Sequence, residues 1–160
     1  MGLVAAKIEP SAKADIVEGL TQALAETSVE TMKAQNFHWN VTGMAFGPLH
    51  ELFQKMYEDH FEGQDLLAER IKQFDVHAEG RYSVFLSRSA IEEHDGRVDA
   101  RAMIETLLAD QETLSSTLAA LCEIADQHGD WATNDLATSR IQAHDKFAWM
   151  LRAHLKTTAA

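Results

Sequence analysis

Four long segments of the chain repeat apolar residues at the spacing of an α-helix, and this periodicity constrains the fold more than any other feature. In the first segment, for example, Val17, Leu20 and Leu24 fall on one face of a helix. No alternating apolar pattern long enough to form a sheet competes with these segments. The chain is therefore predicted to be all-α, with long helices over about 11–41, 47–74, 99–128 and 131–156.

The lengths of the connections predict how these helices are arranged. Thr42-Gly43 and Gly47-Pro48 bound a gap of about five residues, which forces the first two helices to be antiparallel neighbours. His128-Gly129 makes a similarly short link between the last two helices. The middle connection is long and has room for a short helix at 82–89. Two hairpins joined by one long crossover predict a ferritin-like four-helix bundle with a short extra helix between its second and third helices.

Composition and charge set limits on the class of protein. With 160 residues, of which 46% are hydrophobic, we expect one domain over 1–160, with flexible tails at 1–10 and 157–160. No apolar run reaches the ~20 residues of a membrane span, and we expect a cytoplasmic location. The net charge of −11 argues against nucleic-acid binding by whole-surface attraction. It suits a protein that attracts cations, although acidic surfaces are also common without such a role.

One helix face carries a set of metal-binding residue types. At about 100° per residue, His50, Gln54, Asp65 and Glu69 share one face of the second helix. Gln54 and Asp65 are nevertheless about 16 Å apart along the helix axis, whereas a metal ion reaches its ligands within about 2.0–2.6 Å. These residues therefore form two half-sites. A second copy, antiparallel across a two-fold axis, would set His38 and His50 of one chain against the partner's Asp65 and Glu69.

Other metal-site patterns are not found. No histidine has a glutamate three residues before it, so the intrachain di-iron site built from Glu-x-x-His pairs is not predicted. His50 begins a zincin-like pattern, but position 54 is Gln rather than His, so that motif fails. Without the other residues of the set, His38 would be expected to make a structural hydrogen bond and not to bind a metal. Asp65 and Glu69 would be expected to lie on a solvent-exposed helix face. The remaining histidines have no partner at a readable spacing and are assigned no role; they are His60, His77, His94, His128, His144 and His154.

Several motifs, taken in order, resemble the Dps family, the mini-ferritins of bacteria. They are His38-Trp39-Asn40-Val41-x-Gly43, Leu49-His50-x-Leu52-Phe53, Asp65-x-x-Ala68-Glu69-Arg70-Ile71, and in the last helix Asp135-Leu136, Arg140-Ile141 and Trp149-Met150-Leu151-Arg152. The resemblance covers about residues 15–155. It implies a hollow dodecamer that oxidises Fe(II) with hydrogen peroxide or dioxygen, stores ferric mineral and protects against oxidative stress.

The resemblance also assigns the ligands of an inter-subunit ferroxidase site. It implies that His38 and His50 bind iron from one subunit, and that Asp65 and Glu69 bind it from the partner. Family members commonly have a carboxylate four residues after the second histidine, where this chain has Gln54. A neutral amide is a weaker iron ligand, so the site is expected to hold one iron tightly and a second weakly, as a di-iron or mono-iron site.

Three further expectations concern residues around this site and the shell. Trp39 is expected either to donate an electron to a stray oxidant or to lie in a hydrophobic interface. Asp126, Asp130 and Asp135 cluster where related shells form a three-fold pore that attracts cations, with helix capping as the alternative. DNA binding is possible but not favoured, because the ends of the chain lack clustered cations. The competing functions are a DNA-coating shell with weakened iron chemistry and a plain four-helix oligomer.

Overall fold

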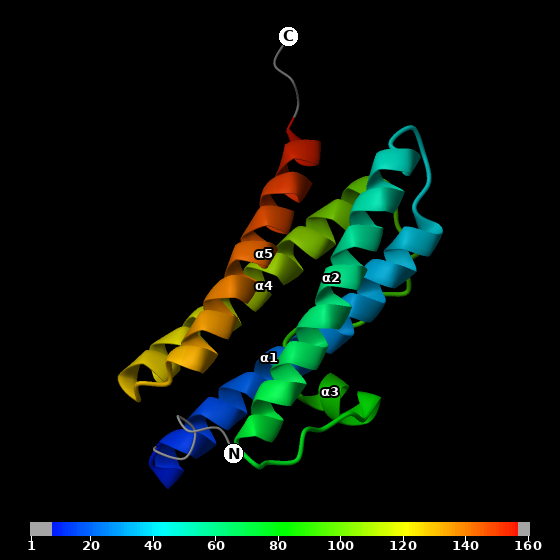
Figure 1. Cartoon of the computed structure of the whole chain (residues 1–160). Helices are drawn as coiled ribbons and strands as arrows, with labels where there is room; N and C mark the ends of the chain where they lie inside the picture. Colours follow the sequence, from blue (N-terminus) through cyan, green and yellow to red (C-terminus); the bar gives the residue numbers. More distant parts are fainter. Residues whose placement is uncertain (1–7, 157–160) are drawn as a thin grey trace.

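The computed structural model describes residues 8–156, which form five α-helices and contain no strand (Figure 1). The helices are α1 (Pro10–Asn40), α2 (Phe46–Gln73), α3 (Tyr82–Arg88), α4 (Ala100–Gln127) and α5 (Trp131–Leu155). Their ends agree with the predicted ones to within about one residue. Of the predicted tails, 1–7 and 157–160 lie outside the described residues. None of the described helices combines the length and apolar character that a membrane span needs.

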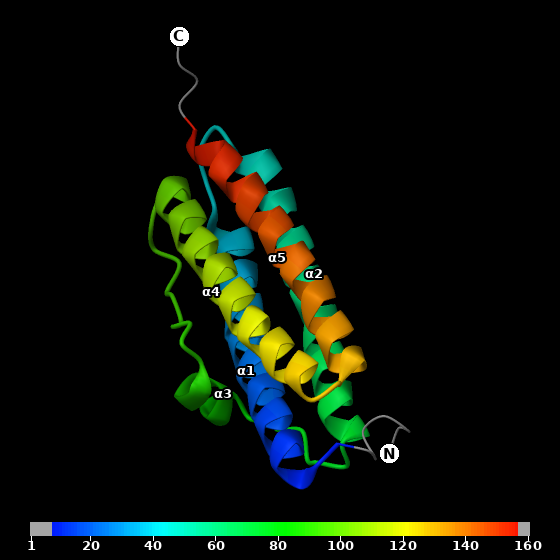
Figure 2. The same ribbon diagram turned by 90° about the vertical axis from the view of Figure 1, so that its left-hand side faces the viewer.

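The four long helices form a bundle of two antiparallel hairpins, as predicted. Helix α1 packs against α2 and α4 against α5, while α1 also contacts α4 and α2 contacts α5. The long connection between α2 and α4 places α3 beside α1 and then runs along the side of the bundle to the start of α4 (Figure 2). This crossover gives the ferritin-like arrangement, so the predicted fold class is confirmed.

Local capping explains where the helices of the second hairpin begin and end. The Asp99 carboxylate accepts a hydrogen bond from the Ala102 amide at 2.8 Å, and the Asp130 carboxylate accepts one from the Thr133 amide at 3.2 Å. Both are N-caps that satisfy an amide at the helix start. Gly129 has φ +67°, a left-handed conformation that costs glycine little and ends α4.

The core contains two apolar clusters, one toward each end of the bundle. The first is formed by residues such as Leu20, Leu67 and Leu118, and the second by residues such as Phe37, Phe53 and Leu107. Along each long helix, polar residues separate the two clusters. Four of these polar residues have fully buried side chains and come one from each long helix; we call them the polar layer, and they are Glu30, His60, Gln111 and His144.

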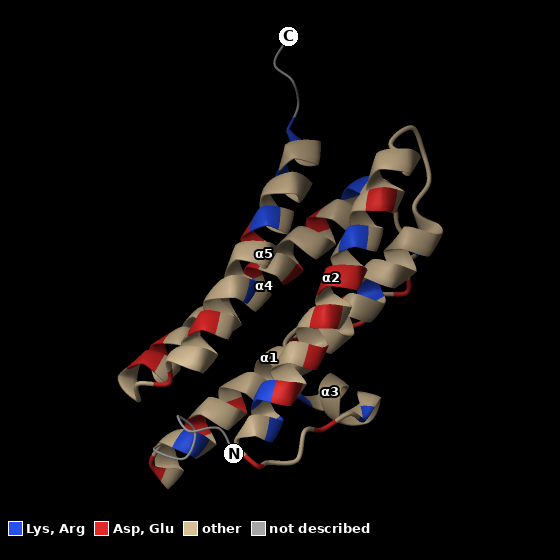
Figure 3. Ribbon diagram, in the orientation of Figure 1, with Lys and Arg blue, Asp and Glu red and all other residues tan. Residues whose placement is uncertain are grey.

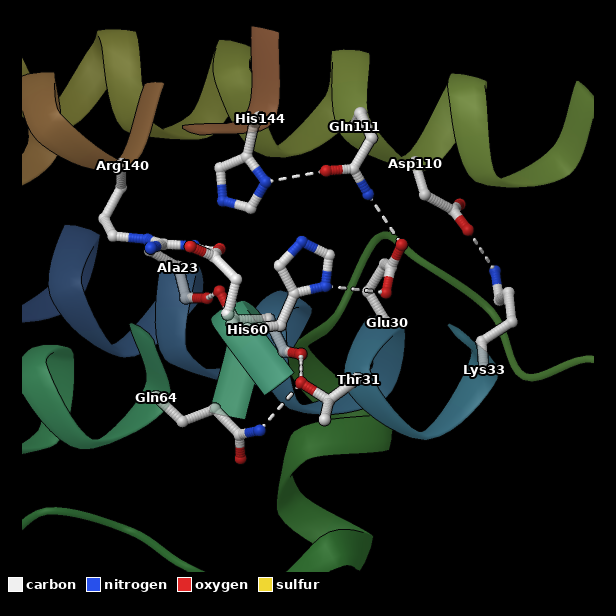
Figure 4. Close-up of polar contacts among 12 residues, drawn as sticks. Ala23, Glu30, Thr31, Lys33, His60, Gln64, Asp110, Gln111, Arg140 and His144 are labelled. Carbon is white, nitrogen blue, oxygen red and sulfur yellow. Dashed lines mark hydrogen bonds and ion pairs between the residues drawn. The ribbon is translucent and has the colours of Figure 1, made fainter. Parts of the chain in front are cut away.

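Hydrogen bonds join the polar layer across the bundle (Figure 4). His60 Nδ1 lies 3.0 Å from Glu30 Oε2, Gln111 Nε2 donates to Glu30 Oε1 at 2.6 Å, and His144 Nδ1 lies 2.8 Å from Gln111 Oε1. The sequence assigned His60 and His144 no role because neither had a partner at a readable spacing. Their partners lie 30 and 33 residues away, so only the packing of the helices reveals them.

Two ion pairs flank the polar layer. Lys33 Nζ lies 2.7 Å from Asp110 Oδ2, and Arg140 Nη2 lies 2.5 Å from Asp59 Oδ2. Burial raises the pKa of the Asp110 carboxyl to about 6, reinforced by the charge of Glu30 and opposed by Lys33. Burial also holds the pKa of His144 well below its usual value, with His60 and Arg140 adding to the effect. A low pKa keeps the His144 imidazole neutral in the folded protein.

The low pKa of His144 predicts a loss of stability in acid. The unfolded imidazole takes up a proton as the pH falls through about 6.5, while the folded one does not. Stability contributed by the neutral imidazole is therefore lost below pH 6.5, by up to about 1.4 kcal/mol per pH unit. The variant His144→Gln has no imidazole to titrate at this position. Its free energy of unfolding is expected to fall less steeply than that of the wild type between pH 6.5 and 5. Unfolding followed by helix circular dichroism in EDTA measures the difference.

A matched control separates this effect from the other titrating groups. His128→Gln changes an exposed histidine at the end of α4 and is expected to keep the wild-type pH dependence. Asp110 has a raised pKa and contributes in the opposite direction, gaining stability as the pH falls through about 6, but it is present in all three proteins and cancels in the comparison. Equal slopes for wild type and His144→Gln would contradict the prediction.

Candidate metal centre

His38 and His50 meet at the closed end of the α1–α2 hairpin, next to the turn that joins the two helices. Their rings stack with centroids 3.7 Å apart and an interplanar angle of 19°. His38 Nδ1 lies 2.8 Å from the His50 carbonyl oxygen, and His50 Nδ1 lies 2.8 Å from the His38 carbonyl oxygen. A carbonyl can only accept, so each Nδ1 donates and each Nε2 keeps a free lone pair. The structure thus brings together the two histidines that the sequence had singled out, both in the tautomer that binds a metal through Nε2.

Aromatic neighbours hold this pair in place. The Tyr57 ring meets the His38 ring edge-on at 5.3 Å, and the Phe46 ring stacks on the His50 ring at 5.0 Å. The His38 side chain is buried and His50 is half-buried. Tyr57 was not predicted from the sequence, because its contact with His38 depends on how α2 packs against α1. The rings are therefore fixed by both hydrogen bonds and packing before any metal binds.

Gln54 lies one helical turn beyond His50 and is half-buried. Its amide nitrogen donates to Glu58 Oε1 at 2.8 Å, which leaves the carbonyl oxygen as the atom available to a metal. Glu58 was also not identified from the sequence, although its position four residues after Gln54 is a readable helical spacing. The Gln54 amide is therefore oriented by the Glu58 carboxylate.

Asp65 and Glu69 are exposed on the later part of α2. Within residues 8–156, no three side chains of His, Cys, Asp or Glu lie close enough together to hold a metal ion. A single chain therefore carries the predicted ligands as two separate halves, the His38–His50 pair and the exposed carboxylates. Acidic residues outnumber basic ones on α2 (Figure 3): they are Glu51, Glu58, Asp59, Glu62, Asp65 and Glu69, against Lys55, Arg70 and Lys72.

The three aspartates predicted to line a pore lie in different environments. Asp126 and Asp135 are exposed. Asp130 is fully buried and its carboxylate lies 2.6 Å from Arg70 Nη2 while capping α5. The prediction was wrong for Asp130, because a buried carboxylate that is already paired with a guanidinium offers no free charge to a passing cation. The alternative of helix capping is confirmed for this residue.

The remaining histidines divide into buried and exposed groups. His60 and His144 belong to the polar layer. The ring of His94 packs edge-on against Phe37 at 5.0 Å, and its Nδ1 accepts a hydrogen bond from the Gly96 amide. The others are exposed; they are His77, His128 and His154. None of the exposed three lies in a group of residues that could hold a metal ion within the described part of the chain.

Comparisons with known proteins agree with this fold. A family model for the ferritin-like domain matches residues 17–160. A relative from Porphyromonas gingivalis, called DNA protection during starvation protein, is 33% identical over 141 residues, covering 88% of this chain and 89% of the relative. DNA protection during starvation protein 2 of Bacillus anthracis is 34% identical over 140 residues, covering 88% of this chain and 96% of the relative.

Solved structures show the same similarity. The Dps protein of Bacillus brevis aligns with a TM-score of 0.89 and 30% identity, covering 93% of this chain and all of that chain. The Dps protein of Vibrio cholerae O1 has the same TM-score and identity, covers 93% of this chain and 94% of that chain, and is described as a member of a broad superfamily of ferritin-like diiron-carboxylate proteins. With its fold, its motifs and these relatives in agreement, the chain belongs to the ferritin-like domain family and, within it, to the Dps family.

Proposed function

We propose that this protein is a ferroxidase and an iron store, with its oxidation sites shared between two copies of the chain. The observation that carries the proposal is the reciprocal hydrogen bonding of His38 and His50, which leaves two imidazole Nε2 atoms free side by side. Imidazole and carboxylate together suit Fe(II). Asp65 and Glu69 lie on the same helix face as His50 but too far along it to reach the same ion, so a partner chain must supply them.

The surface around the half-sites supports a second copy as the partner. Large apolar side chains are exposed on this side of the bundle, including Phe46 (47%), Phe61 (69%) and Tyr82 (72%). Exposed apolar groups of this size mark a contact surface. Trp39 is 60% exposed beside His38, and we assign it first to this interface, because an exposed indole gains most from being covered. A hollow dodecamer built from such two-fold pairs is the assembly that the family resemblance implies.

The chemistry needs two irons close together, with iron as substrate rather than as a resident cofactor. Two Fe(II) ions give up two electrons to one molecule of hydrogen peroxide, which takes up two protons and leaves as two molecules of water. The histidines of one chain and the partner's carboxylates hold the ions within reach of the same oxidant molecule. The carboxylates favour the more highly charged Fe(III) and so stabilise the product. Transfer of both electrons in one encounter avoids release of a hydroxyl radical.

DNA protection is the second candidate function, favoured by the names of the Porphyromonas and Bacillus relatives. The net charge of −11 opposes it, because binding to the phosphate backbone requires clustered cations. Lys13 at the start of α1 is accompanied by Glu9 and Asp15, and the end of α5 has only Arg152 and Lys156 nearby. Twelve copies of a weak contact would still add up at low salt. Iron oxidation is therefore the function that the residues of this chain support best.

The shared site predicts a specific pattern of loss and rescue. His50→Ala and Asp65→Ala are each expected to reduce aerobic or peroxide-driven Fe(II) oxidation, followed by ferric absorbance, to the rate in buffer. Co-expression of the two variants is expected to restore about a quarter of the wild-type rate, because a quarter of randomly paired sites take His50 from one intact copy and Asp65 from another. His154→Ala, on an exposed histidine of α5, serves as the matched control and keeps the full rate.

Two results would count against this proposal. Wild-type oxidation no faster than in buffer would exclude the ferroxidase and leave the DNA-coating shell as the better reading. Wild-type activity without any rescue in the mixed assembly would show that the ligands act within one chain, contrary to the inter-subunit arrangement.

Gln54 predicts a weak second iron position. Gln54→Asp restores a negative charge four residues after His50 and is expected to tighten binding of the second Fe(II) about tenfold, equivalent to about 1.4 kcal/mol. Anaerobic Fe(II) titration by calorimetry measures the two binding steps. Gln54→Asn keeps a neutral amide and is the matched control, with no gain expected. Equal affinities for wild type and Gln54→Asp would show that the charge at this position does not limit the second iron.

Asp126 and Asp135 remain as candidates for the iron entry pore. The double variant Asp126→Asn/Asp135→Asn is expected to slow mineral formation several-fold at low ionic strength and to remove most of its salt dependence, because the charges that attract cations are gone. Stopped-flow absorbance at several salt concentrations makes the comparison. Asp75→Asn, on an exposed aspartate after α2, is the control. Unchanged kinetics in the double variant would exclude these residues from the entry route.

A further inference from the structure

The hydrogen bonds of the polar layer form a chain through the four long helices, with two histidines at its ends. The chain runs from His60 on α2 to Glu30 on α1. It continues from Glu30 to Gln111 on α4, and from Gln111 to His144 on α5. Within residues 8–156 no direct hydrogen bond joins His144 back to His60, although their ring centroids are only 5.0 Å apart. The link between α5 and α2 is therefore the one that the side chains do not supply.

Three buried nitrogen atoms between α2 and α5 have no partner. His60 Nε2, His144 Nε2 and Arg140 Nε make no hydrogen bond with any atom of residues 8–156. Arg140 precedes His144 by one helical turn on α5 (Figure 4), and its guanidinium packs against Gly63, one turn after His60 on α2. The charges of His60 and Arg140 both act on His144. Buried polar atoms almost always have a partner, so three of them in one place point to a ligand between these two helices.

The hydrogens on these nitrogens decide which ligand fits. Gln111 donates its amide N–H to Glu30, so its carbonyl oxygen faces His144 Nδ1. His144 Nδ1 must then donate, and Nε2 of the neutral ring has a lone pair that requires a donor. The Arg140 guanidinium has only N–H groups and requires an acceptor. A metal ion would serve the lone pair alone and would lie beside a positive charge, and an anion would serve the N–H alone. Water both donates and accepts.

Water also suits His60 in either of its protonation states. The Glu30 carboxylate lies 3.0 Å from His60 Nδ1, so that nitrogen carries a hydrogen. Nε2 of the neutral ring accepts a hydrogen bond from water, and Nε2 of the protonated ring donates one to it. The separation of the rings fits as well. A water about 2.9 Å from each Nε2 lies about 4 Å from each ring centroid, so one molecule can span two centroids 5.0 Å apart.

We propose that one buried water molecule bridges His60 Nε2 and His144 Nε2 and closes the polar layer into a ring of hydrogen bonds through all four long helices. Its oxygen is directed toward Arg140, whose Nε–H is the unpartnered buried donor at this place in the described part of the chain. His60 belongs to the α1–α2 hairpin and His144 to the α4–α5 hairpin, so the water joins the two hairpins. Buried waters with about three such partners are part of a fold and costly to remove.

Crystals of the full-length protein grown with EDTA test the proposal. We expect an electron-density peak within about 2.7–3.2 Å of both Nε2 atoms, which refines as water and gives no anomalous signal. In the variant His144→Leu, whose side chain has a similar volume and no nitrogen, the peak is expected to be lost. The control His154→Leu changes an exposed histidine of the same helix and is expected to keep the peak.

Four results would overturn the proposal. They are a wild-type map without a peak between the rings, a direct Nε2–Nε2 hydrogen bond in its place, an anomalous peak that identifies a metal ion, and a peak that persists in His144→Leu. Circular dichroism establishes whether His144→Leu keeps its helices, and if it does not, the wild-type map alone decides the question. Because the crystals contain EDTA and no Fe(II) is added, the result does not depend on the ferroxidase proposal.

Discussion

The antiparallel packing of α1 against α2 is the interaction on which both the fold and the candidate chemistry depend. Next to the turn of this hairpin it brings the backbone of each helix to the histidine of the other, so that His38 and His50 orient one another. About two to three helical turns further into the bundle, it sets His60 against Glu30. A one-residue change in the register of the two helices would break both arrangements, because each depends on the facing positions of the same pair of helices.

Periodicity was sufficient to predict the helices but not the interior of the bundle. The helix ends and the crossover followed from apolar spacing and from turn residues such as Gly43 and Gly129, which are local signals. The partners of His60 and His144 lie on other helices, and no spacing in a single sequence reports them. The same limit explains the error at Asp130, whose pairing with Arg70 spans 60 residues. The capping role of Asp130 at the start of α5 involves an amide only three residues away, so it could be predicted from the sequence.

The proposed half-sites rest on a different kind of sequence signal. His50, Asp65 and Glu69 are on one helix, so their separation follows from helix geometry alone, and that separation excludes a site within one chain. What helix geometry could not give is the orientation of the rings, because the Nδ1 atoms are held by backbone carbonyls of a neighbouring helix. Sequence thus sets which groups are available, and packing sets which nitrogen of each ring is free.

The excess of negative charge connects the surface to the interior. Outside, exposed carboxylates lie along α2 and at the α4–α5 turn, with fewer basic residues among them. Inside, Glu30 pairs with His60 and accepts a hydrogen bond from Gln111, while Glu26 accepts one from Gln22. An apolar core of the same volume would avoid the cost of desolvating these carboxylates. The hydrogen bonds that connect the polar layer across all four long helices offset part of that cost, and they form only when the four helices are in register.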